Sequence, residues 1–82
     1  MTKFDYSDVV RVVAHAEERL RPGAIASVIG VFPEKPAGKY FETFPAGAIY
    51  AIEFEDGQAI DIAESLLEPD TISQDKGHAA ET

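Results

Sequence analysis

Residues 48–63 alternate apolar and polar side chains on both sides of an Asp-Gly pair. Large apolar side chains occupy every second position on each arm, namely Tyr50, Ile52, Phe54, Ile60 and Ile62. A period of two is typical of a strand with one buried face. The segment therefore predicts a β-hairpin that contributes a single apolar face to the core.

The length of the turn decides which side chains of this hairpin share a face. A two-residue loop made of Asp56 and Gly57 would place Ile60 on the polar face. A three-residue loop that begins one residue earlier, at Glu55, pairs Ile52 with Ile60 and keeps the large apolar residues together. This loop needs a left-handed residue at its last position, where Gly57 stands. We expect a type I turn with a glycine bulge.

A third strand is expected over residues 22–32. It follows a Pro-Gly turn and ends before Pro33, because proline interrupts strand pairing. Gly30 lies near its end, at a position typical of a bend or a bulge. The strand is therefore expected to bend and to serve two parts of a curved sheet.

Residues 8–20 are compatible with two structures. Four valines in five positions favour a strand, whereas a stripe of apolar residues also fits a helix. We predict a strand over 8–14 followed by a turn or short helix over 15–20. After the hairpin, residues 64–69 are predicted to form a single 3₁₀ turn that ends at proline.

A connection of 15 residues, 33–47, separates the third strand from the hairpin. It is rich in proline and glycine and holds three aromatic residues, Tyr40, Phe41 and Phe44. Residues 39–44 are expected to form a short extra strand. The aromatic side chains either cover the core of a small domain or stand outward as anchors for a partner, and both roles stay open.

The chain is thus expected to be one mostly β domain over 1–69, with four or five antiparallel strands and one short helical turn. Residues 70–82 hold a single branched aliphatic side chain and an excess of acidic residues. Such a composition buries little apolar surface. This segment is expected to be a flexible acidic C-terminal tail.

Composition excludes several classes of function. The sequence has no cysteine, which rules out disulfides, zinc fingers and thiol nucleophiles. Asp and Glu number 15 against 7 Lys and Arg, for a net charge of −8, which argues against direct nucleic-acid binding. No apolar run approaches a membrane span, and the N-terminus does not resemble a signal peptide. We expect a cytoplasmic protein.

Catalysis is not expected either. His15 and His78, the only histidines, lack the spacing of metal ligands. Glu53 and Glu55 are predicted to share the outward face of one strand, where open water cannot raise a carboxyl pKa for acid catalysis. We therefore expect no catalytic, cofactor or metal site, and a protein that is not an enzyme.

Three motifs carry a resemblance to known domains. They are G-x-x-x-x-V-x-G-V over 23–31, Y-x-I-x-F-E-D-G over 50–57 and F-D-Y-x-x-V-V over 4–10. The first two resemble small SH3-like barrels of bacteria, and the third is similar to the start of SH3-like immunity proteins of bacterial toxin systems. The resemblance implies a small SH3-like antiparallel barrel that neutralises a cognate toxin by direct contact.

An acidic inhibitor of this kind suits a basic toxin domain, because opposite charges accelerate and steer association. We expect the partner-binding residues to be aromatic anchors with an acidic rim, namely Tyr40, Phe41, Glu42, Phe44, Glu53, Glu55 and Asp56. Two alternatives remain. One is an acidic, phage-type inhibitor that mimics nucleic acid, and the other is an accessory or scaffolding subunit of a larger enzyme.

Overall fold

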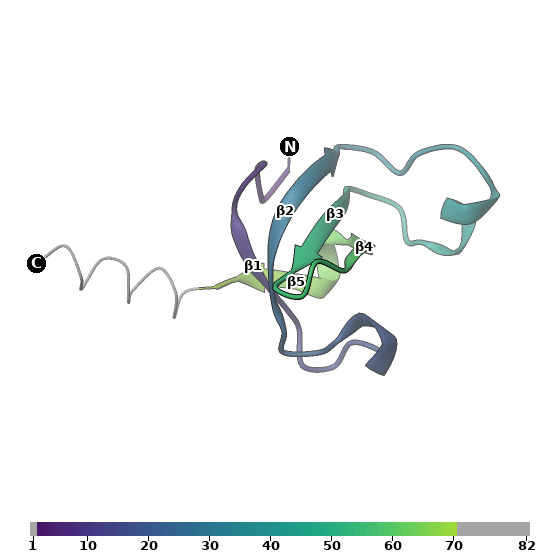
Figure 1. Cartoon of the computed structure of the whole chain (residues 1–82). Helices are drawn as coiled ribbons and strands as arrows, with labels where there is room; N and C mark the ends of the chain where they lie inside the picture. Colours follow the sequence, from purple (N-terminus) through teal and green to yellow (C-terminus); the bar gives the residue numbers. More distant parts are fainter. Residues whose placement is uncertain (1, 71–82) are drawn as a thin grey trace, which may run out of the picture.

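The computed structural model describes residues 2–70, which form one sheet of five antiparallel strands (Figure 1). The strands are β1 (Val9–Val12), β2 (Ile25–Phe32), β3 (Ile49–Phe54), β4 (Ala59–Ala63) and β5 (Leu67–Pro69). Their order across the sheet is β4-β3-β2-β1-β5. Within the described residues, the helical elements are three 3₁₀ turns, η1 (Glu18–Leu20), η2 (Lys39–Thr43) and η3 (Glu64–Leu66). The mostly β prediction is confirmed, with three helical turns where one was expected.

The β3–β4 hairpin has the register that its alternation predicts. Ile52 lies opposite Ile60, and Tyr50 lies opposite Ile62. Tyr50, Ile52 and Ile62 are buried, and Ile60 is partly buried against the same core. The pairing thus places the large apolar side chains of both strands on one face.

The turn of this hairpin has three residues, as expected. The Phe54 amide donates a hydrogen bond to the Gln58 carbonyl at 2.8 Å, and the Gly57 amide donates one to the Phe54 carbonyl at 3.0 Å. Gly57 has a φ of 87°, in the left-handed region that glycine adopts without strain. The glycine-bulge prediction is therefore confirmed.

β2 is the longest strand and pairs with both β1 and β3. Its register with β3 shifts between Val28 and Gly30, which is the bulge expected at Gly30. A Cβ atom at Gly30 would lie 3.2 Å from the Cβ atom of Ala51, so the two backbones approach closely there. The bulge bends β2 and lets one strand pair along both halves of the sheet.

The predictions for residues 8–20 and 64–69 agree with the structure to different degrees. Residues 8–20 form β1 and then η1, in agreement with the predicted order of strand and short helix. The prediction of a single turn over 64–69 is correct only for η3, because the residues that follow form β5 and pair with β1. A three-residue strand is too short to show alternation, so its partner strand decides its conformation.

The prediction of a short extra strand over 39–44 is wrong. These residues form η2, which follows Gly38 at a φ of 122°. Aromatic residues favour strands only where a neighbouring strand supplies hydrogen bonds, and within η2 the backbone bonds are local instead. One of them runs from the Phe44 amide to the Phe41 carbonyl, at 3.0 Å.

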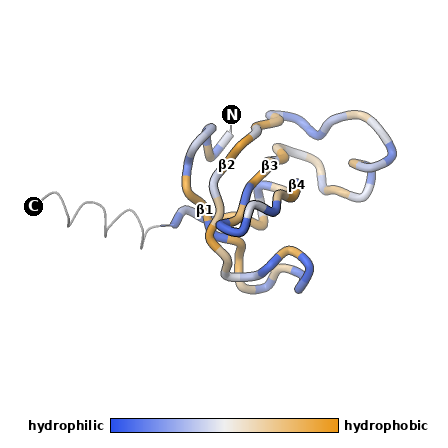
Figure 2. The backbone as a smooth tube through the Cα atoms, viewed as in Figure 1, coloured by the Kyte–Doolittle hydropathy of each residue, from blue (hydrophilic) through white to orange (hydrophobic). Residues whose placement is uncertain are grey.

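The main core draws on all five strands, which carry the hydrophobic stretches of the backbone in Figure 2. Its buried members are Phe4, Val10, Val12, Leu20, Ala26, Val28, Ala48, Tyr50, Ile52, Phe54, Ile62 and Leu67. Hydrophilic residues gather instead in the connections, at the tip of the 33–47 loop and around η1. Phe4 precedes β1 and still packs in this core, so the N-terminal segment belongs to the domain.

The structure also bears on where the domain ends. Asp70, which the sequence places in the expected tail, has a fully buried side chain. Asp70 Oδ1 lies 3.0 Å from Nη2 of Arg11 on β1. Asp70 therefore packs with the domain, and the rest of the expected tail, 71–82, lies outside the described residues.

Candidate protein-interaction site

The aromatic loop, residues 33–47, projects from the ends of β2 and β3 (Figure 1). Its η2 turn brings three rings together. The centroids of Tyr40 and Phe41 are 4.7 Å apart, those of Phe41 and Phe44 are 5.3 Å apart, and those of Tyr40 and Phe44 are 5.5 Å apart. Each pair has the tilted or edge-on geometry that aromatic rings prefer. The loop thus carries a small apolar cluster of its own.

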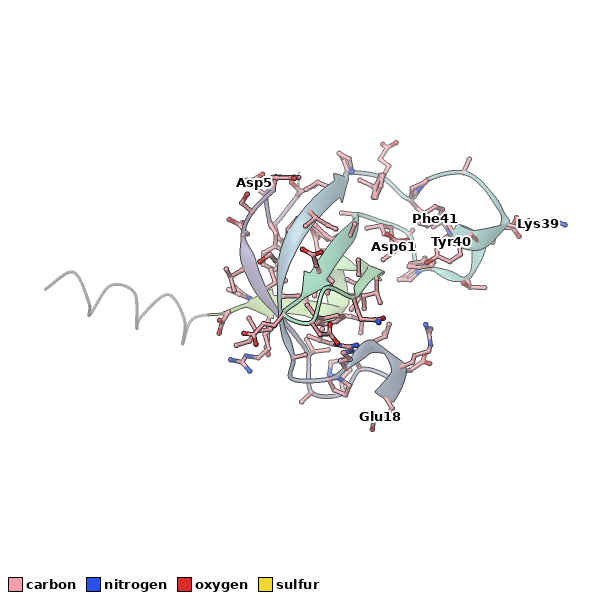
Figure 3. The ribbon with its side chains drawn as sticks, viewed as in Figure 1. Asp5, Glu18, Lys39, Tyr40, Phe41 and Asp61 are labelled. Atoms are coloured by element: carbon pink, nitrogen blue, oxygen red, sulfur yellow. The ribbon has the colours of Figure 1, made fainter. Side chains whose placement is uncertain are left out.

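Two contacts attach this cluster to the rest of the structure, and a third closes the loop on itself. The Phe41 ring packs on Phe32 of β2, with a centroid distance of 6.4 Å. The Tyr40 hydroxyl donates a hydrogen bond to Oδ2 of Asp61 on β4 at 3.1 Å (Figure 3). Nζ of Lys35 donates to the Phe44 carbonyl at 3.1 Å and joins the two arms of the loop. The loop is therefore held against β2 and β4.

Ile49 is buried on the face of the sheet to which the aromatic loop attaches. Ile49 alternates with Tyr50 along β3 and so faces away from the main core, yet its side chain is fully buried. Its neighbours across the sheet are Phe32 and Ala63, and Phe32 in turn contacts Phe41. Phe41 of the loop therefore packs on the outer face of the sheet, the face on which Ile49 is buried.

The three rings of the cluster differ in their exposure to solvent. Phe41 and Phe44 are half-buried, whereas Tyr40 is 61% exposed. Desolvation, followed by the hydrogen bond to Asp61, raises the pKa of Tyr40 above its usual value. The hydrogen bond to Asp61 thus fixes the Tyr40 phenol in position while its ring stays open to contact. Phe41 and Phe44 therefore pack on the structure, and the role of partner anchor stays a prediction for the exposed ring of Tyr40.

A recess beside the loop, here called the loop groove, lies between η1, the aromatic loop, β4 and η3. Apolar side chains form most of its walls, namely Leu20, Phe44, Pro45, Ile62, Ala63 and Leu66. Its polar members are Glu17, Arg19, Thr43 and Asp61. Arg19 Nε lies 3.0 Å from Glu17 Oε2, so these two charges compensate each other. Asp61 leaves the loop groove with a negative charge.

The expected acidic rim is split by the fold. Glu42 lies on η2 beside the aromatic rings, whereas Glu55 and Asp56 lie in the turn after β3, at the other end of that strand. Glu53 is exposed on the outer face of β3, opposite Ser27. The structure thus brings Tyr40, Phe41, Glu42 and Phe44 together, and it separates them from the other three residues.

Asp56 is engaged within its own turn. Oδ1 accepts the Gln58 amide at 3.0 Å, and Oδ2 lies 3.0 Å from Nη1 of Arg21. The Gln58 hydrogen bond, with Arg21 as a further cause, holds the pKa of Asp56 below its usual value. The guanidinium of Arg21 also stacks on Phe54, 4.6 Å from the ring centroid. Asp56 therefore stabilises the turn rather than presenting a free carboxylate.

Sequence reasoning missed the groove residues supplied by other elements. Asp61 belongs to the outward-facing positions of β4, and its place in the alternation could have marked it as available to a loop. Leu20 and Leu66 come from separate 3₁₀ turns, and only the tertiary fold brings them to Phe44. No local pattern marks that contact.

The described residues do not offer a metal centre. No group of three or more His, Cys, Asp or Glu side chains between residues 2 and 70 could hold a metal ion. His15 is exposed, and His78 lies outside the described residues. Over the same residues, no helix has the length and apolar character needed to cross a bilayer.

The chain was also compared with known proteins. Comparisons with protein-family models, with curated proteins and with solved structures gave no significant match.

Proposed function

We propose that this protein is a non-enzymatic protein-binding module that neutralises a basic partner by direct contact, as an immunity protein neutralises a bacterial toxin. The observation that carries the proposal is the presentation of Tyr40. Its ring is exposed, yet Asp61 and two neighbouring rings hold it in position. It lies beside the loop groove, whose walls are mostly apolar and which carries the negative charge of Asp61. Tyrosine is among the residues that most often dominate binding energy at interfaces.

The fixed position of Tyr40 supports a binding role on energetic grounds. Association costs free energy for each side chain that it immobilises. Tyr40 is already held by one hydrogen bond and two ring contacts, so binding orders little that is not ordered in the free protein. The net charge of −8 adds long-range attraction for a basic partner.

The architecture that we propose is an SH3-like barrel. Supporting this proposal, the edge strands β4 and β5 are consecutive in the chain, and only the three residues of η3 separate them. So short a connection keeps the two edges of a bent sheet close together, as closure requires. The aromatic loop and η1 then flank one end of the barrel, where the loop groove lies.

The direct test is capture from the source organism with matched variants. Wild-type protein, Tyr40→Ala and Tyr6→Ala are immobilised in parallel, because Tyr6 is also exposed, at 67%, and lies outside the aromatic loop. We expect a partner with net positive charge that wild type and Tyr6→Ala retain equally. Tyr40→Ala should weaken binding by roughly 2 kcal/mol, mainly through faster dissociation.

The same partner distinguishes the immunity role from its alternatives. A partner that arrests growth when produced alone, and not when co-produced with this protein, supports neutralisation. Competition for the partner by duplex DNA would favour a nucleic-acid mimic, whereas a partner enzyme that needs this chain for activity would favour an accessory subunit. An acidic partner, or equal binding by the two tyrosine variants, contradicts the proposal.

A further inference from the structure

A second recess lies on the outer face of β1, β2 and β3, away from the loop groove. We call it the outer groove and define it by Val9, Ile25, Ser27, Glu53 and Glu55. Val9, Ser27 and Glu53 are direct cross-strand partners, so their side chains stand in one row on the same face. The floor is half-buried and apolar, at Val9 and Ile25, and two exposed carboxylates stand along one side.

The charge of the outer groove is uncompensated. The three ion pairs among residues 2–70 use Asp70, Glu17 and Asp56, and none includes Glu53 or Glu55. Arg11 and Arg21, the basic residues next to this face, are already paired with Asp70 and Asp56. A cation from outside is therefore the group that this surface lacks.

We propose that the outer groove binds an extended segment of the basic partner through two Arg or Lys side chains that are separated by one residue. Glu53 and Glu55 are separated only by Phe54, the last residue of β3, so their Cα atoms are roughly 7 Å apart. Alternate side chains of an extended segment repeat at the same spacing and point to the same side. The aliphatic stems of these side chains then lie on Val9 and Ile25 while their charged ends meet the carboxylates.

Arginine suits this groove better than lysine. Its planar guanidinium forms paired hydrogen bonds with a carboxylate, and the stem of either residue covers apolar surface. The Ser27 side chain, between Val9 and Glu53 in the row, adds a hydroxyl that accepts a further N–H group. This inference relies on the proposed function only for the basic character of the partner.

The test uses the full 82-residue protein and a synthetic peptide, acetyl-Ala-Arg-Ala-Arg-Ala-amide. Backbone amide NMR shifts of the ¹⁵N-labelled protein are followed as the peptide is added at low salt. We expect saturating shifts centred on Val9, Ser27 and Glu53. The same peptide with citrulline in place of arginine keeps the shape, removes the charge, and should cause no such shifts.

Matched variants separate this groove from general attraction to an acidic protein. The double variant Glu53→Gln/Glu55→Gln should bind the arginine peptide about five-fold more weakly, as expected for the loss of two exposed ion pairs. Glu18→Gln/Glu34→Gln removes the same charge from two exposed positions outside the outer groove and should bind like wild type. The NMR spectrum of each free variant reports whether it is folded.

Equal binding by the two double variants would overturn the proposal, since net charge alone would then explain the interaction. Shifts centred on Leu20 and Phe44, or no shifts at all, would overturn it as well. None of these results decides the proposed function. That function is tested separately, by comparing how Tyr40→Ala and Tyr6→Ala bind the captured partner.

Discussion

The Tyr50 hydroxyl donates a hydrogen bond of 2.6 Å to Oε2 of Glu64, which also accepts the Lys3 amide at 2.9 Å. The Tyr50 oxygen accepts the Phe4 amide at 3.2 Å, and the Phe4 ring packs edge-on against Tyr50 with centroids 5.6 Å apart. One buried phenol therefore joins the N-terminal segment, β3 and η3. Glu64, which directly follows β4, thus holds the residues that precede β1 in place.

Removal of this hydroxyl should lower stability. Tyr50→Phe keeps the ring and leaves the buried Phe4 amide without its acceptor, so we expect a loss of about 1–2 kcal/mol in the free energy of unfolding. Urea denaturation measures the difference. Tyr6→Phe removes an exposed hydroxyl and should change the free energy of unfolding by less than about 0.5 kcal/mol. Equal midpoints for the two variants would contradict the role of Tyr50.

The Tyr50–Glu64 contact also predicts an effect of pH. Hydrogen bonds from Tyr50 and then from the Lys3 amide hold the pKa of Glu64 below its usual value. The stability that this group contributes is complete above its unfolded-state pKa of about 4.3, and it is lost as pH falls through the lower folded-state pKa. Glu64→Gln should be less stable at pH 7 and lose less stability on acidification. Thermal melts between pH 7 and 3 test this, and parallel curves for the two proteins would refute it.

The three-residue turn predicts a penalty that comes from the backbone alone. Gly57 has positive φ, and a Cβ atom there would meet nothing within 4 Å. Gly57→Val should therefore cost about 1–3 kcal/mol through backbone strain, whereas Gly57→Asn should cost less because asparagine tolerates the left-handed region. Chemical denaturation of both variants checks the order. A valine variant as stable as the asparagine variant would show that the turn adopts another conformation.

The hairpin could be predicted from the sequence because its information is local. Only one turn length places Ile52 opposite Ile60 with a glycine at the left-handed position, and Gly30 marks a bulge in the same local way. The aromatic loop could not be predicted so well. Aromatic residues between prolines fit a strand or a 3₁₀ turn equally, and the choice depends on contacts with Phe32 and Asp61 on other strands.

The acidic residues show the same limit. Composition gives the total charge but not which carboxylates are occupied, and the structure divides them. Glu64, Asp56 and Asp70 are engaged within the fold, whereas Glu53 and Glu55 are exposed and outside the ion pairs of the described residues. A site assigned from charge alone therefore combines carboxylates that stabilise the protein with carboxylates that are exposed and outside these ion pairs.

The aromatic rings should separate stability from binding. Phe41 packs on Phe32, which lies opposite the buried Ile49, so Phe41→Ala should cost about 1–2 kcal/mol of stability, less than a truncation in a full core. Tyr40→Ala loses one surface hydrogen bond and should cost less than about 1 kcal/mol. Urea denaturation gives both values. If Tyr40→Ala proves the more destabilising, Tyr40 supports the loop and is not its presented ring.

The position of β5 should depend on the ion pair between Arg11 and Asp70. Nη2 of Arg11 contacts the fully buried carboxylate, while Nη1 donates to the Gly23 carbonyl at 2.9 Å. Arg11→Met takes a guanidinium away from a buried carboxylate, and we expect a loss of about 2–4 kcal/mol. Arg19→Met is the matched control, because its ion pair with Glu17 lies on the surface and should contribute less than about 1 kcal/mol.

A double-mutant cycle isolates the Arg11–Asp70 interaction from the packing of either side chain. Asp70→Asn keeps the shape of Asp70 and removes its charge, so Arg11→Met should cost much less in that background. We expect a coupling energy of about 1–3 kcal/mol from urea denaturation of the four proteins. A coupling energy near zero would mean that the ion pair does not hold β5, and that backbone pairing with β1 and the burial of Leu67 suffice.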